Sequence, residues 1–175
     1  MYRDLQTRFI LWLARTLNPP VLRDRPIQIC PDHLRNLPDG TLGREVVRFW
    51  DENQFEPIES GDYIQRTHDI WHVVTGLSAS EHDEFMLQAF TRAQVFRPTS
   101  AIVVLYGVVH RSLSWRELRY SLHWGRIAQR LLDWDIEADW ATPLPEVRRK
   151  LGLPQVSLSK QTRKQQSAIP DTMNH

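Results

Sequence analysis

Two histidines and two carboxylates occur close together in this chain, and their spacing restricts how it can fold. Residues 68–72 read HDIWH, and Glu84 follows after eleven residues. On a helix, residues four positions apart project from the same face, so His68 and His72 can converge on one cation. Asp69 borders that face. The set makes a metal site feasible, with His68, Asp69, His72 and Glu84 as candidate ligands.

Glu84 can join the histidines only if the chain reverses direction after His72. A continuous helix would place Glu84 roughly 18 Å beyond His72, whereas metal–oxygen bonds are about 2 Å long. The intervening residues suit a reversal. Gly76 fits the position just past a helix C-terminus, and Ser78 and Ser80 are candidate N-caps for a following helix. We therefore expect the ligands to come from two adjoining antiparallel helices.

Size and composition exclude several classes of protein. The chain has 175 residues, of which 41% are hydrophobic, and this predicts one domain with a sizeable core. The charge is nearly balanced, with 22 basic and 21 acidic residues, and gives no sign of nucleic-acid binding. The single cysteine, Cys30, excludes an intrachain disulfide framework. No run approaches the roughly 20 apolar residues that a membrane span needs.

The periodicity of apolar residues predicts an all-α fold, a single-domain bundle of about seven helices. The expected helices are 3–17, 42–52, 62–75, 81–96, 101–109, 114–134 and 145–151. The proline-rich residues 20–40 are expected to form an irregular connection with one short helix. Because helix 101–109 is hydrophobic on most sides, we expect it to be central. Residues 154–175 are rich in Ser, Gln and Lys and are predicted to be a disordered tail.

Four further segments, together with the metal motif, resemble a known family. Residues 68–84 fit HDxxH-x11-E, the signature of the ubiquinone biosynthesis protein Coq4 family. The other resembling segments are GTLGRE at 40–45, AFTRAQ at 89–94, WGRIA at 124–128 and PLPEVR at 143–148. The resemblance is strongest over residues 37–153, so we expect residues 1–153 to form one Coq4-like helical domain.

The resemblance implies a bound divalent cation, usually zinc, and a role in making ubiquinone. The family is associated with removing the C1 carboxyl group of a polyprenyl hydroxybenzoate precursor, in some accounts with hydroxylation at C1. It is also associated with organising the other ubiquinone-biosynthesis enzymes at the membrane. The expected partners are therefore the prenylated precursor, those enzymes and the membrane surface, with no nucleic acid. A homodimer is left open.

The residue types themselves allow metal chemistry without selecting the metal. Imidazoles and carboxylates suit zinc, iron or manganese, and we expect Zn²⁺, with Fe²⁺ or Mn²⁺ as alternatives, mainly because of the resemblance. Our hypothesis is a metal-dependent decarboxylase (a lyase), with Asp69 and His72 as catalytic residues. A water molecule or a carboxylate would handle the proton. Asp69 is preferred for this role, because its direction on the helix differs from that of the histidines.

Two other functions remain as alternatives. One is a non-catalytic scaffold that binds prenylated intermediates and partner enzymes, with the metal stabilising the fold. The other is a hydrolase that uses a metal-activated water, although the sequence lacks a complete His-Asp phosphohydrolase ligand set. The amphipathic residues 5–17 can either lie in a membrane interface or pack against the domain. We expect a bacterial protein on the cytoplasmic side of the inner membrane, or on the matrix side of the mitochondrial inner membrane in a eukaryote.

Overall fold

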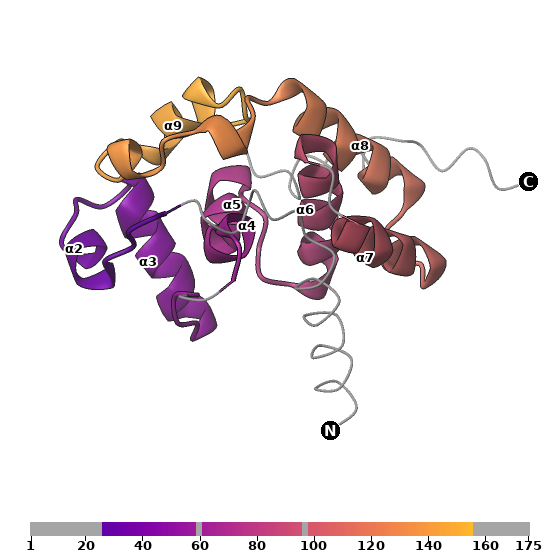
Figure 1. Ribbon diagram of the computed structural model, residues 1–175, viewed down its shortest axis with the longest axis horizontal. Coiled ribbons are helices and arrows are strands. Elements are labelled where there is room, and N and C mark those ends of the chain that lie inside the picture. The colour runs from indigo at the N-terminus through magenta and orange to yellow at the C-terminus, as the bar shows by residue number, and fades with distance from the viewer. Residues whose placement is uncertain (1–25, 59–60, 96–97, 156–175) are drawn as a thin grey trace, which may run out of the picture.

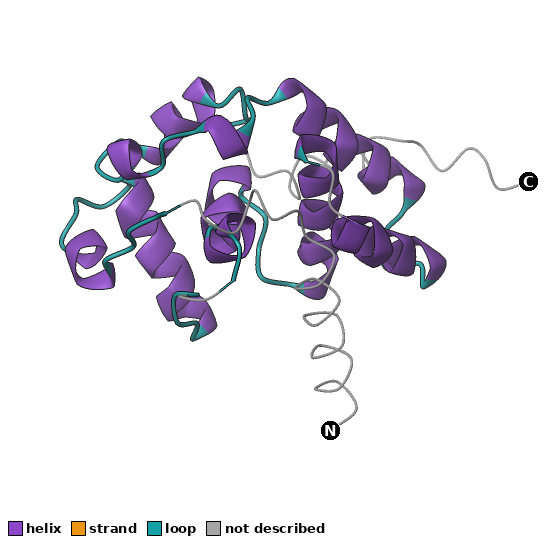
Figure 2. Ribbon diagram, in the orientation of Figure 1, coloured by secondary structure: helices purple, strands orange, loops and turns teal. Residues whose placement is uncertain are grey.

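The computed structural model describes residues 26–58, 61–95 and 98–155, and these residues are helical without any strand (Figure 1, Figure 2). This confirms the all-α prediction. The helix predicted over 3–17 and all but the first two residues of the predicted tail lie outside the described residues. The helices are α2 (Pro31–Arg35), α3 (Leu42–Asn53), α4 (Tyr63–Arg66), α5 (His68–Thr75), α6 (Glu81–Gln94), α7 (Pro98–Val109), α8 (Trp115–Ile127) and α9 (Leu144–Lys150). Two 3-10 turns, Leu131–Asp133 and Glu137–Asp139, connect α8 to α9.

Helix α5 is the centre of the molecule. It packs against α3 on one side and α6 on the other, and α9 lies across α3 and α5 (Figure 1). Every residue of α5 except His68 is buried. Trp71 is completely buried, as are Ile70 and Val74. The histidine-bearing helix is thus held by tertiary contacts along almost its whole length.

The expectation that the most apolar helix would be central is wrong. Helix α7 packs against α6, and several apolar side chains on its outer side are exposed. Leu105 and Val109 are 64% and 67% exposed, and Ile102 and Tyr106 are also exposed. Hydrophobicity on all sides shows that a helix can be buried, but the position of its neighbours decides whether it is. The amphipathic α5 occupies the centre instead.

The helix predicted over 62–75 is interrupted at Thr67, so α4 and α5 are separate elements. The Thr67 hydroxyl donates to the carbonyl of Tyr63 at 2.8 Å, and the Thr67 backbone N–H donates to the same oxygen. Side-chain bonds of this kind often bend helices, and the Thr67 backbone departs from α-helical geometry, with φ −100° and ψ 4°. The result is that His68 lies in the first turn of its own helix rather than in the middle of a longer one.

The helix predicted over 114–134 ends at Ile127 because a buried side chain replaces its backbone hydrogen bonds. The Gln94 amide nitrogen donates to the carbonyl of Gly125 at 2.7 Å, and its oxygen accepts from the N–H of Leu131 at 2.8 Å. The N–H of Gln129 is directed to the carbonyl of Leu151 instead of continuing the helix. Local periodicity contains no information about this long-range partner.

Segments distant in sequence meet around α3 and α5. Thr41 and Pro143 form an isolated β-bridge, which brings the start of α3 to the start of α9. From α9, the Arg148 guanidinium donates to the carbonyls of Val73 and Val74 at 2.9 and 3.0 Å. It therefore satisfies acceptors at the C-terminal end of α5, where a helix leaves carbonyls without helical partners. Among the described residues, no helix is both long and apolar enough to cross a membrane.

Replacing Gly125 tests the close contact between α6 and α8. A Cβ atom there would lie 2.5 Å from the Phe90 carbonyl oxygen and 2.7 Å from the Ala93 methyl group. Gly125→Ala should lower the free energy of unfolding by about 1–3 kcal/mol in urea titrations. At an exposed helical site the same change would raise stability by about 1 kcal/mol. Arg126→Ala, at the exposed neighbouring position, is the control, and a stabilised Gly125→Ala variant would contradict the close packing.

Candidate metal centre

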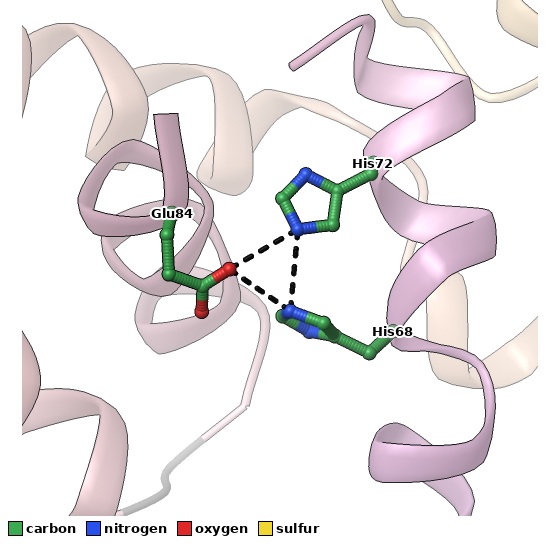
Figure 3. A group of neighbouring side chains, drawn as sticks. All are labelled: His68, His72 and Glu84. Carbon is green, nitrogen blue, oxygen red and sulfur yellow. Dashed lines mark hydrogen bonds and ion pairs between the residues drawn. The ribbon is translucent and has the colours of Figure 1, made fainter. Parts of the chain in front are cut away.

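The side chains of His68, His72 and Glu84 converge between α5 and α6 (Figure 3). The Oε2 atom of Glu84 lies 3.0 Å from Nε2 of His68 and 3.1 Å from Nε2 of His72. The two ring nitrogens are 3.2 Å apart. Ligands about 2.0–2.1 Å from a tetrahedral zinc ion are separated by about 3.3 Å, so this spacing suits a shared cation. The structure therefore brings together three of the four predicted ligands.

The reversal between the helices follows the predicted signals. Gly76 adopts a left-handed conformation (φ 68°) after α5, where a non-glycine side chain would be strained. Ser80 is the N-cap of α6 and accepts from the N–H of Asp83 at 3.2 Å. Ser78 is not the cap; its hydroxyl donates to the Asp83 carboxylate at 2.6 Å. These contacts place Glu84 in the first turn of α6, opposite the histidines.

His72 is fixed on two sides. Its Nδ1 lies 3.3 Å from the carbonyl oxygen of Leu77, and its ring stacks on Phe49 with a centroid separation of 5.4 Å. Because a carbonyl only accepts, Nδ1 donates to Leu77, and this contact directs Nε2 toward Glu84 and His68. The side chain is only 4% exposed. His72 is therefore oriented to bind an ion through Nε2.

Glu84 supplies the negative charge of the cluster. Burial raises the pKa of its carboxyl group, but attraction to His68 and hydrogen bonds from His68 and His72 outweigh this, so the pKa lies well below its usual range. Its side chain is 35% exposed, and that of His68 is 23% exposed. The cluster thus combines an ionised carboxylate and two imidazoles at a site that remains open to solvent.

Asp69 does not lie in the cluster. Its Oδ2 accepts a hydrogen bond from the indole Nε1 of Trp50 at 2.9 Å, in a buried contact between α5 and α3. Neighbouring residues on a helix point about 100° apart, so Asp69 cannot share the direction of His68. Sequence reasoning did not identify Trp50 as the partner of Asp69. The only available signal was an acidic side chain and an indole N–H on successive predicted helices, because a buried indole N–H usually needs an acceptor.

A cleft of about 490 Å³ adjoins the cluster and shares His72 with it. The cleft lies between α3, the C-terminal end of α5 and α9. Its lining includes the apolar side chains of Phe49 and Leu77 and charged groups of both signs: Arg48, Arg148, Glu45 and Glu52. The cleft therefore combines a flat apolar surface with charged groups.

The donor set fits a divalent cation. Two imidazole nitrogens and one carboxylate oxygen are the ligand types found in catalytic zinc sites, in which three protein ligands leave a position for water or substrate. Iron and manganese accept the same ligands. His68, His72 and Glu84 would hold the ion.

Fold and site together define an all-α protein whose central helix carries two histidines that face a glutamate on the next helix. The sequence model described as coenzyme Q (ubiquinone) biosynthesis protein Coq4 matches residues 18–157. The match covers the cluster, the cleft and all the described helices. The chain belongs to the Coq4 family.

Individual relatives agree with this assignment. The mitochondrial ubiquinone biosynthesis protein COQ4 homolog of Mus musculus is 29% identical over 140 residues, covering 69% of this chain and 53% of the mouse protein. The Danio rerio homolog is 29% identical over 164 residues, covering 79% and 60%. The crystal structure of a candidate ubiquinone biosynthesis protein from Nostoc punctiforme superposes with a TM-score of 0.62 and 26% identity, covering 83% of this chain and 80% of that one. The chain spans only about half the length of the mouse relative.

The position of Asp69 leads to a prediction that separates a ligand from a packing contact. Asp69→Asn keeps an oxygen that accepts from Trp50, so it should bind one zinc ion per chain like the wild type. Asp69→Ala leaves the buried indole N–H without that acceptor and should lower the free energy of unfolding by about 1–3 kcal/mol. Metal analysis of purified protein and urea unfolding measure the two effects. Loss of zinc from Asp69→Asn as complete as that from His72→Ala would show that Asp69 is a ligand.

Proposed function

We propose that this protein takes part in ubiquinone biosynthesis as a metal-dependent decarboxylase that acts at C1 of a polyprenyl hydroxybenzoate. The observation that supports this most directly is the His68–His72–Glu84 cluster beside the cleft at His72. Membership of the Coq4 family supports a role in the ubiquinone biosynthesis pathway. In this proposal the cluster binds the cation and the cleft binds the carboxylated ring beside it.

The residues of this chain have defined roles in the proposed reaction. A bound cation supplies Lewis acidity toward the oxygens of the substrate. His72 belongs both to the cluster and to the lining of the cleft, so a ring held against Phe49 would lie beside that one ligand. The Arg48 guanidinium also lines the cleft, but it is paired with Glu45 and Asp39, so a substrate carboxylate would compete with these two partners for it. We assign no step to Asp69, because its carboxylate is held by Trp50.

Water is the only further reactant that this reaction needs. A proton from water is added at C1, the bond between C1 and the carboxyl carbon breaks with its electron pair left on the ring, and carbon dioxide and hydroxide are released. The para hydroxyl group of the ring assists by donating electron density toward C1. In the oxidative form of the reaction, a hydroxyl group would replace the carboxyl group, and an added oxidant would be required. The product therefore distinguishes the two forms, with hydrogen at C1 in one and oxygen in the other.

A scaffold function is the second candidate, and the outer side of α7 favours it. Ile102, Leu105, Tyr106 and Val109 form an exposed apolar stripe that is available to another protein or to a prenyl chain. In this case the ion would hold α5 to α6 without taking part in chemistry. The prenylated substrate places either activity at a membrane surface, which we propose to be the inner face of a bacterial inner membrane.

Substrate turnover by purified protein tests the enzyme against the scaffold. Zinc-loaded wild type, incubated with a short-tailed 3-prenyl-4-hydroxybenzoate labelled with ¹³C in the carboxyl group, should release labelled carbon dioxide. Removing the metal with a chelator should stop this release, and adding zinc back should restore it. His72→Ala should lower the rate by more than about 100-fold, because it removes a ligand rather than a group that supports one.

His123→Ala is the matched control, because His123 is an exposed histidine on α8 outside the cluster. It should turn over like the wild type. A wild-type protein that binds zinc, gains thermal stability from it and releases no carbon dioxide, with or without an oxidant, would favour the scaffold. Full turnover by metal-free His72→Ala would reject metal-dependent decarboxylation.

A further inference from the structure

A line of hydrogen bonds connects the cluster to α7. The Gln88 amide nitrogen donates to Oε1 of Glu84 at 2.7 Å. The Ser100 hydroxyl donates in turn to the amide oxygen of Gln88 at 2.8 Å. Ser100 is only 1% exposed and belongs to α7, whereas Gln88 and Glu84 lie one turn apart on α6. Neither Gln88 nor Ser100 belongs to the signature motif.

The two carboxylate oxygens of Glu84 thus have different contacts. Oε2 is the atom that faces both histidines, at 3.0 and 3.1 Å. Oε1 accepts a hydrogen bond from Gln88 instead, at 2.7 Å. A carboxylate held in this way presents one oxygen to an ion rather than two.

The carboxylate of Glu84 determines which end of the Gln88 amide faces it. An amide has a donor end and an acceptor end of nearly the same shape, and only the donor end stabilises a carboxylate. The amide nitrogen therefore faces Oε1, and the Ser100 hydroxyl anchors the other end of the amide by donating to its oxygen. Helices α6 and α7 also pack tightly near this contact. A Cβ atom at Gly107 of α7 would lie 2.7 Å from the ring of Phe85, the residue after Glu84.

We propose that Gln88 is a positioning residue that makes Glu84 a one-oxygen metal ligand, and that Ser100 on α7 holds the Gln88 side chain in place. This inference rests on the proposed metal site. The consequence is that the coordination of the ion depends on α7, a helix that carries none of its ligands. An acidic ligand free to coordinate through both oxygens would occupy the position that a substrate needs.

Co²⁺ and Zn²⁺ binding by full-length variants tests the proposal. Gln88→Met keeps the length of the side chain but removes the donor, and should weaken Zn²⁺ binding about 10–100-fold in competition with a chromophoric chelator. With Co²⁺, the visible absorption should fall, because a second coordinated oxygen of Glu84 raises the coordination number and makes the site more centrosymmetric. Ser100→Ala should change both measurements in the same direction, with a smaller loss of affinity of about three- to tenfold.

The double variant Gln88→Met/Ser100→Ala should behave like Gln88→Met alone, because Ser100 acts through Gln88. Ser121→Ala is the matched control for loss of a buried hydroxyl, since the Ser121 hydroxyl has no hydrogen-bond partner within the described ranges. It should bind both ions like the wild type. Ser100→Ala lies outside the cluster and keeps the test available if Gln88→Met does not fold.

The outcomes separate this proposal from the one on which it rests. If wild type binds neither ion at one per chain, the metal site itself is rejected, and the role of Gln88 with it. If wild type binds both ions while folded Gln88→Met and Ser100→Ala keep its affinity and its Co²⁺ spectrum, the metal site stands and the positioning role is rejected. Additive losses in the double variant would also reject it, because they would show that Ser100 acts independently of Gln88.

Discussion

The burial of α5 is the constraint on which the rest of this structure depends. Packing between α3 and α6 covers every residue of the helix except His68, so the rotation of the helix is determined by its apolar neighbours. Once that rotation is set, Nε2 of His72 must point toward α6 and the Asp69 carboxylate must point toward α3. The same contacts therefore build the core and aim the candidate ligands, and no flexible loop carries any of the three.

Long-range polar contacts hold α5 in that position. The Trp50 indole holds Asp69 from α3, and the Arg148 guanidinium holds the C-terminal carbonyls from α9. The segments at 40–45 and 143–148, which resembled the Coq4 family, meet at the bridge between Thr41 and Pro143. Although these two segments are far apart in the sequence, they are neighbours in the structure, and both support the helix that carries the histidines. Buried polar bonds of this kind specify a single arrangement in which apolar packing alone would tolerate several.

Several helices contribute to the candidate metal centre. The candidate ligands come from α5 and α6, the cleft is formed by α3, α5 and α9, and the proposed support for Glu84 includes Ser100 of α7. Substitutions in different helices should therefore have separable effects. Helix α7 has two distinct sides. Ser100 on one side contacts Gln88, and the exposed apolar side chains lie on the opposite side.

The sequence by itself determined the helical class, the chain reversal at Gly76 and the convergence of His68, His72 and Glu84. These follow from local periodicity, from the conformational freedom of glycine and from the four-residue spacing of a helix turn. Only the tertiary structure decided that Asp69 faces Trp50, that the apolar α7 is peripheral, and that α8 ends where Gln94 takes over its hydrogen bonds. The physical reason is that spacing within one element sets which residues share a face, whereas the partner of each face is chosen by packing between elements far apart in the chain.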